Sequence, residues 1–363
     1  MSWHEGERAT VAVGLIAATI SLGFFAALML LSWDFTTLRA ADGYPVAADY
    51  SNYWAAAKLA LAGKPALIYH FDELHQVQQQ VFGTHSRYSS GWYYPPTYLL
   101  VVLPLGLLPY LPSLLIWISS TLLLYLVVLS RISDHPVFLP LCLTFTGIGE
   151  NMVFGQNGFL SGTLLGGGLL LMERLPLAAG CLFGLLSYKP HFIVLIVLAL
   201  IIGRYWKVLM VTIGMSLLLV SLSLVVFGYH VWLEYFKIMS VPMSLLEKGL
   251  APWIIMPTFF SAILSAGLGV KSAYLVQGVV MLAVAAGVAW VWSKKTSLAS
   301  RGAVLVLGTL LFTPYAFIYD LAILALPLAW LWEDGRRHGR RPGELLLLLF
   351  GWLMPGAMPL LWN

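Results

Sequence analysis

Residues 208–233 read VLMVTIGMSLLLVSLSLVVFGYHVWL and contain no Asp, Glu, Lys or Arg. Uncharged windows also cover residues 9–33, 88–130 and 272–293. A transmembrane helix needs about 20 apolar residues, because the hydrocarbon core of a bilayer is about 30 Å thick. Over the 363-residue chain, 60% of residues are hydrophobic and 10% are charged, whereas soluble domains carry roughly 25% charged residues. The sequence therefore predicts an all-α, polytopic membrane protein and excludes a soluble globule, a disordered chain and a coiled coil.

Basic residues cluster between the apolar segments. Such clusters mark the cytoplasmic side of a membrane protein, so the formal net charge of +4 indicates orientation and not nucleic-acid binding. If every cluster faces the cytoplasm, the chain has about eleven spans, within a range of nine to twelve, with the N-terminus inside and the C-terminus outside. The clusters are Arg131, 173–174, 204–207, 294–301 and 336–341, and the predicted spans are 10–33, 111–130, 136–149, 158–172, 176–188, 191–203, 208–228, 272–292, 302–317, 319–333 and 343–362.

The whole of 1–363 is predicted to be a single integral membrane domain. In this scheme, two long connections between spans fall on the outer side. Residues 34–110 form an outer, periplasmic loop with juxtamembrane helices, and residues 229–271 form a second outer loop with a partly inserted helix. Loops of this size are uncommon unless they carry function. We therefore expect the chemistry on the outer face, and we expect the protein in a bacterial inner membrane.

The first outer loop contains the most informative motif. Residues 49–57 read DYSNYWAAA, and residues 91–98 read GWYYPPTY. Tyr53 and Tyr94 are candidate substrate contacts. Alternatively, they belong to an interfacial belt of the kind that aromatic residues form at a membrane boundary. A carboxylate in apolar surroundings is costly unless it is paired or used. Asp49 is therefore a candidate catalytic residue, with Asn52 beside it as a candidate substrate contact.

Residues 149–158 read GENMVFGQNG and join two predicted spans on the outer side. Glycines permit tight backbone turns, and amide side chains suit hydroxyl-rich ligands. Glu150, Gln156 and Asn157 are candidate ligand contacts. The alternative is a plain turn between two helices.

Residues 187–191 read SYKPH and interrupt a long apolar run, again on the outer side. Lys189 is a point charge suited to a phosphate, with His191 close to it, although a lysine there could also extend toward lipid headgroups.

Tyr319 and Asp320 form the fourth polar feature, since Asp320 is the only Asp, Glu, Lys or Arg between Arg301 and Glu333. Ionisable residues inside membrane segments are functional by default, although one could simply anchor the outer end of a helix. The histidines of the first outer loop lack a tight ligand spacing, so we expect no metal site and no cofactor.

These motifs, in this order, resemble glycosyltransferase family 87. The resemblance rests on Asp-Tyr-x-x-Tyr-Trp-Ala-Ala-Ala, Tyr-Tyr-Pro-Pro, Gly-Gln-Asn-Gly, Tyr-Lys-Pro and Pro-x-x-x-x-Tyr-Asp, and it covers about residues 10–330. The family contains membrane enzymes of the GT-C type, including polyprenyl-phosphate-mannose-dependent α-mannosyltransferases.

The resemblance implies an inverting transfer of a hexose, with mannose favoured, from a polyprenyl-phosphate sugar to a hydroxyl of a lipid or glycan acceptor. Asp49 would be the general base, and Lys189, His191, Gln156 and Asn157 would bind the donor phosphate. The implied substrate contacts are Asn52, Tyr53, Tyr94, Glu150, Tyr319 and Asp320. The mannosyltransferase branch is expected to carry a histidine-containing segment where this chain has Tyr319-Asp320. If that position helps the base, Tyr319 or Asp320 must substitute for the histidine. This departure weakens the assignment to mannose, and the donor sugar stays open.

A transporter or flippase of a lipid-linked or sugar substrate is the alternative from another class. Many transporters consist of repeat-related halves with broken helices at the middle of the membrane. This sequence shows no such repeat, and its polar features fall at the outer side. A purely structural protein would not need Asp49, Lys189 and Asp320 on the same side.

Overall fold

The computed structural model describes residues 33–40, 43–83, 91–251 and 253–358, together with positions 12, 15, 16, 19, 20, 23, 27 and 31. Most residues of the span predicted for 10–33 lie outside this part of the chain. The described residues are mostly helical, which confirms the all-α part of the predicted fold class. A two-residue hairpin of β1 (Trp33–Asp34) and β2 (Arg39–Ala40) pairs Trp33 with Ala40 and Asp34 with Arg39.

Short helices follow this hairpin and form one end of the molecule. They are α2 (Ala48–Leu61), the 3-10 helix η1 (Pro65–Tyr69), α3 (Phe71–Phe82), α4 (Pro96–Val102) and the 3-10 helix η2 (Leu103–Leu107). The predicted outer loop 34–110 is therefore largely helical.

The remaining helices form a bundle. They are α5 (Tyr110–Ser130), α6 (Phe138–Leu143), α7 (Thr146–Phe154), α8 (Gly158–Leu171), α9 (Pro176–Leu185), η3 (Leu186–Tyr188), α10 (Pro190–Ile202), α11 (Trp206–Phe227), α12 (Tyr229–Ile238), α13 (Val241–Glu247), η4 (Trp253–Ile255), α14 (Phe259–Ser265), α15 (Gly269–Trp292), α16 (Leu298–Leu311), η5 (Ile318–Leu324), α17 (Ala325–His338) and α18 (Glu344–Ala357).

Proline and glycine set several of these boundaries. Pro176 and Pro190 open α9 and α10, where the missing N–H of proline costs nothing because the first turn has no intrahelical partner for it. Gly228 ends α11 with a φ of +79°, a conformation that favours glycine. These residues explain why the apolar runs break into hairpins at these points.

Three described helices are long and apolar enough to cross a membrane, namely α5, α11 and α15. Six shorter apolar segments accompany them: Pro96–Leu107, Gly158–Leu171, Pro176–Tyr188, Pro190–Ile202, Leu298–Leu311 and Glu344–Ala357. The helical membrane character is thus supported, whereas the predicted count of about eleven spans is not confirmed. The span predicted over 136–149 is two helices, α6 and α7, because Phe145 leaves the helical conformation with a ψ of 120°.

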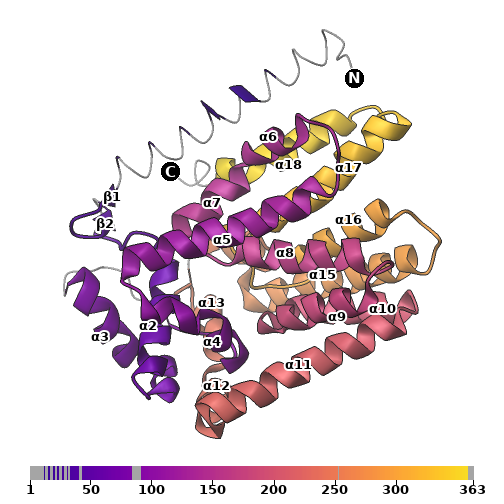
Figure 1. Cartoon of the computed structure of the whole chain (residues 1–363). Coiled ribbons are helices and arrows are strands. Elements are labelled where there is room, and N and C mark those ends of the chain that lie inside the picture. The colour runs from indigo at the N-terminus through magenta and orange to yellow at the C-terminus, as the bar shows by residue number, and fades with distance from the viewer. Residues whose placement is uncertain are drawn as a thin grey trace.

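The bundle has two chemically different ends. Figure 1 shows α2, α3 and α4 together at one end of the long helices, whereas the connection from α15 to α16 lies at the other. At that other end Arg301 pairs with Glu173 at 2.7 Å, and Ser133 donates to Glu333 at 2.6 Å. The basic clusters of the sequence therefore gather at the end opposite α2.

Candidate active site

A cavity of about 910 Å³ lies at the end of the bundle formed by α2 and the loops around it. Its wall combines acidic, basic, amide and aromatic side chains from distant parts of the chain. The lining residues whose side chains carry a nitrogen or oxygen atom are Tyr44, Asp49, Asn52, Tyr53, Trp92, Tyr93, Tyr94, Gln156, Tyr188, Lys189, His191, Tyr235, Tyr315, Tyr319 and Asp320.

Asp49 stands in the first turn of α2, and the side-chain amide of Gln156 donates to its Oδ2 at 2.9 Å. The other end of that amide is also fixed. Gln156 Oε1 accepts from the hydroxyls of Tyr53 and Tyr94 (3.3 Å) and from the backbone N–H of Asn157 (3.2 Å). Because the donors converge on Oε1, the Nε2 group must face Asp49.

Asn157 supports this network from behind the cavity wall. It is fully buried and does not line the cavity, and its Nδ2 donates to the Tyr94 hydroxyl at 2.9 Å. Asn157 is therefore placed to position Tyr94, although the resemblance suggested a contact with the donor phosphate.

The Gly155–Gly158 turn delivers Gln156 to the cavity through close packing. Gly155 has a φ of +65°, and a Cβ atom there would lie 2.7 Å from Tyr50 Cβ. Asn151 clamps the turn, since its Nδ2 donates to the Gln156 carbonyl at 3.1 Å and its Oδ1 accepts from Gly158 N–H at 2.8 Å. Glycine at these two positions is thus a steric requirement of the turn.

Lys189 and Asp320 form an ion pair on the cavity wall. Lys189 Nζ lies 2.5 Å from Asp320 Oδ1, and the two side chains are 5% and 6% exposed. Lys189 stands between η3 and α10, while Asp320 lies in η5, where its Oδ2 accepts from Phe317 N–H at 3.0 Å. Each of these two buried charges is stabilised by the other, because removing one partner would leave an unpaired charge away from water.

Tyrosine rings form a rigid shell around these groups. Tyr53 packs edge-on against Tyr94 and Tyr98, with centroids 5.8 and 5.3 Å apart, and Tyr98 stacks on Tyr188 at 4.5 Å. Burial raises the pKa of Tyr94 above its ordinary value. Its hydroxyl therefore stays protonated in neutral solution and retains its hydrogen-bonding capacity.

An apolar wall from the second outer loop closes another side of the cavity. Sequence reasoning singled out the loop 229–271 by its length but named none of its residues as contacts. The wall consists of Pro242, Leu245, Leu250, Ala251 and Ile255, with Phe317 from the segment before η5.

Nine of the eleven residues predicted from sequence line this one cavity. They are Asp49, Asn52, Tyr53, Tyr94, Gln156, Lys189, His191, Tyr319 and Asp320. Glu150 is half-buried on α7 and does not line the cavity, so its predicted substrate contact has no support from this geometry. Among the described residues, no group of three or more His, Cys, Asp or Glu side chains is placed to hold a metal ion.

The sequence model of glycosyltransferase family 87 matches residues 92–314, which is more than half of the chain. The match includes the Tyr94, Gln156 and Lys189 parts of the cavity. It begins after Asp49 and ends before Asp320, so the family match does not cover these two carboxylates. No curated protein and no solved structure matches the chain.

Proposed function

This chain belongs to glycosyltransferase family 87, as its motifs predicted, and from that premise we propose that it transfers a hexose, with mannose favoured, from a polyprenyl-phosphate sugar to a hydroxyl of a lipid or glycan acceptor. One observation carries the proposal. The Asp49 carboxylate accepts a hydrogen bond from the side-chain amide of Gln156. It lines the same cavity as the ion pair of Lys189 and Asp320. Such a cavity offers a base for a hydroxyl and a cation for a phosphate.

Asp49 is the proposed general base. The acceptor hydroxyl gives its proton to the Asp49 carboxylate while its oxygen forms a bond to the anomeric carbon of the sugar. The bond from that carbon to the phosphate oxygen breaks, and its electron pair leaves with the polyprenyl phosphate. Attack opposite the leaving group inverts the anomeric centre. Gln156 supports this step because it holds Oδ2 by a hydrogen bond and orients the carboxylate.

Lys189 is the proposed partner of the leaving phosphate. An ammonium group has three N–H donors. One points at Asp320, and among the described residues no other group accepts a hydrogen bond from Lys189 Nζ, so two donors can bind phosphate oxygens. Negative charge develops on the phosphate as the glycosidic bond breaks, and a preorganised cation stabilises that charge. Asp320 then serves to position Lys189.

The apolar wall supports a donor with a hydrocarbon tail. Leu245, Leu250 and Ile255 line the cavity on segments that follow α11, one of the helices long enough to span a membrane. A prenyl chain could contact this wall while its phosphate reaches Lys189. The face of Tyr94 offers a surface for a sugar ring.

The proposed orientation places this cavity on the periplasmic side of a bacterial inner membrane. Its support is the gathering of Lys and Arg at the opposite end of the bundle, since basic loops face the cytoplasm. The N-terminus would then be cytoplasmic.

The test offers purified protein in nanodiscs a panel of radiolabelled polyprenyl-phosphate sugars with lipid and glycan extract from the host. We expect label to move from one donor into a new covalent product of inverted configuration. Label that crosses the membrane of reconstituted vesicles without entering a product would contradict the proposal and favour a transporter.

A further inference from the structure

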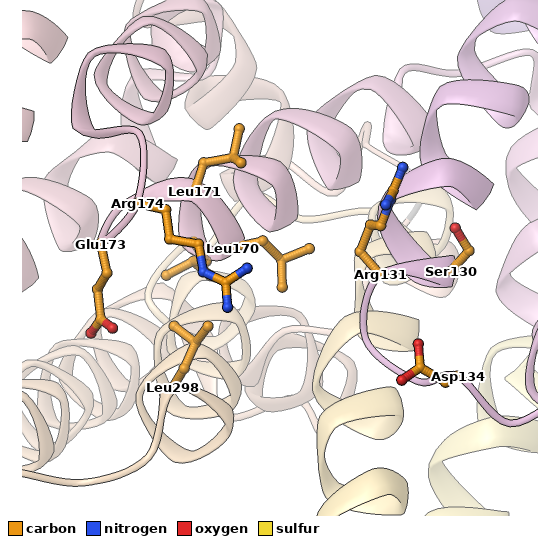
Figure 2. Close-up of a pocket in the computed structure, with 9 residues that line it drawn as sticks. Ser130, Arg131, Asp134, Leu170, Leu171, Glu173, Arg174 and Leu298 are labelled. Atoms are coloured by element: carbon orange, nitrogen blue, oxygen red, sulfur yellow. The ribbon is translucent and has the colours of Figure 1, made fainter.

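A second cavity, of about 800 Å³, lies at the C-terminal ends of α5 and α8. None of its residues belongs to the candidate active site. It is lined by Ser130, Arg131, Asp134, Leu169, Leu170, Leu171, Glu173, Arg174 and Leu298. Figure 2 shows the guanidinium group of Arg174 extending among the leucines toward the side that carries Arg131 and Asp134.

The two arginines dominate the charge of this cavity. Glu173 is already bound, since its Oε1 accepts from Arg301 at 2.7 Å and from the Tyr205 hydroxyl at 3.1 Å. Among the residues that the structure describes, neither Arg131 nor Arg174 forms an ion pair. Apart from Glu173, the charged lining residues are two arginines and one carboxylate, that of Asp134, so the cavity favours an anion.

The position of the cavity indicates where that anion comes from. Helix α5 has 21 residues, which is about 30 Å at 1.5 Å per residue and matches the hydrocarbon core of a bilayer. Tyr110, at its first residue, bonds to the Val46 carbonyl next to α2, and Arg131 follows its last residue. The second cavity thus lies at the membrane boundary opposite the candidate active site.

The remaining wall is apolar. Leu170, Leu171 and Leu298 are half-buried and lie beside the guanidinium groups. A soluble phosphate would contact the arginines and leave the leucines in water, whereas a phospholipid satisfies both, with its phosphate on the arginines and its acyl chain on the leucines. Guanidinium groups bind phosphate oxygens in pairs of parallel hydrogen bonds.

We propose that this cavity is a binding site for an anionic phospholipid, with Arg131 and Arg174 holding its phosphate and the leucines contacting the start of its acyl chain. The site is independent of the proposed transfer reaction, so its test reads lipid binding and not activity.

The experiment titrates phosphatidylglycerol into the full-length protein in a neutral detergent and counts bound lipids by native mass spectrometry. The test variant is Arg131→Gln/Arg174→Gln. The matched control is Arg204→Gln/Lys294→Gln, which removes the same charge from the same end of the bundle at exposed residues outside the cavity. Phosphatidylcholine and inorganic phosphate are titrated in parallel, and thermal unfolding without lipid checks the fold of each variant.

We expect one tightly bound phosphatidylglycerol on the wild type and on the control, and affinity about 30-fold lower on the cavity variant, as two lost basic contacts near a membrane surface predict. Equal binding by the cavity variant and the control would overturn the site. Saturation of the site by inorganic phosphate, measured as loss of phosphatidylglycerol binding at low phosphate concentration, would overturn its assignment to a lipid.

Discussion

A single side chain, that of Gln156, connects Asp49 to the hydroxyls of Tyr53 and Tyr94. The resemblance suggested a donor-phosphate contact for Gln156. Both ends of its amide are engaged within the protein, and we therefore propose that Gln156 positions the carboxylate of Asp49.

Gln156→Glu tests this assignment through a pH profile. The variant places a second carboxyl group where the amide now lies, 2.9 Å from Asp49 Oδ2, and two carboxylates that share a site raise the pKa of one of them. Since Asp49 must be deprotonated to accept a proton, the acid limb of kcat/KM should move to higher pH.

Gln156→Leu is the companion variant, because it removes the hydrogen bond without adding a charge. It should lower kcat by about 10²-fold through misplacement of the base, with no shift of the acid limb. If both variants keep the wild-type profile and rate, Gln156 does not position the base.

The pairing of Lys189 with Asp320 could not be predicted from the sequence, although both residues were candidates. They are 131 positions apart, and no local pattern of spacing reports a contact between two loops so distant in the chain. The same holds for Asp49 and Gln156, 107 positions apart. What the sequence did predict is that these residues share one end of the bundle. Gln156, Lys189 and Asp320 interrupt apolar runs on the predicted outer side, and Asp49 lies in the first outer loop.

At the scale of elements, the Lys189–Asp320 pair joins the η3–α10 junction to η5, and its removal has a predictable cost. Lys189→Met or Asp320→Asn alone strands one buried charge or donor, which costs about 3 kcal/mol of stability. The double variant Lys189→Met/Asp320→Asn removes both charges, keeps an oxygen that can accept from the Phe317 N–H, and should recover most of that loss.

Thermal unfolding in detergent measures the recovery, and transfer activity is measured in parallel. The double variant should unfold near the wild-type temperature and remain inactive, since the proposed phosphate contact is gone. If the single variants unfold at the same temperature as the wild type, the ion pair does not contribute to the stability of the fold.

A second prediction at this scale concerns the packing of the turn at Gly155–Gly158. A Cβ atom at Gly158 would lie 2.5 Å from Asn151 Oδ1 and 2.6 Å from the Tyr319 carbonyl. Gly158→Ala should therefore cost about 1–3 kcal/mol by overpacking and lower the transfer rate, because Gln156 and Asn157 move with the turn.

Gly214→Ala in α11 is the matched control for that variant. A Cβ atom there would meet nothing within 4 Å, and alanine favours a helix over glycine by about 1 kcal/mol. It should be neutral or stabilising in the same thermal unfolding assay. A Gly158→Ala protein as stable as this control would contradict the packing argument.

Helix positions were predictable where an apolar run ended at charges, prolines or glycines. The spans predicted at 111–130, 158–172 and 208–228 appear as α5, α8 and α11 within two residues. The prediction of one span over 136–149 was wrong because a threonine within an apolar run does not by itself reveal a break in the helix. Thr144 and Phe145 interrupt the helix there, and the buried Phe145 packs against Trp352, a contact set by tertiary structure.

At the scale of the whole molecule, the proposed orientation puts the two ends of the bundle on opposite sides of the membrane. Lys64 and Lys294 are both exposed, the first near the candidate active site and the second at the basic end. With the native Cys142 and Cys181 replaced by alanine, Lys64→Cys should react with a membrane-impermeant thiol reagent added to intact cells. Lys294→Cys should react only after the membrane is broken.

The reverse pattern of labelling would place the cavity in the cytoplasm and contradict the proposed orientation. Labelling of both positions in intact cells would mean that α5 and its neighbours do not separate two compartments. Each variant is assayed for transfer first, so that only folded protein is interpreted.

The claim on which the mechanism rests is that Asp49 is the base for glycosyl transfer. Its most direct test is the single-turnover rate of sugar transfer by wild type, Asp49→Asn and Asp72→Asn, with the donor that the panel identifies. Asp72 is the matched control, since it is exposed on α3 and does not line the cavity. We predict that Asp49→Asn loses at least about 10²-fold in rate, within the 10²–10⁴-fold range of general-base catalysis, while Asp72→Asn retains the wild-type rate. A folded Asp49→Asn protein that transfers sugar as fast as Asp72→Asn would contradict the account.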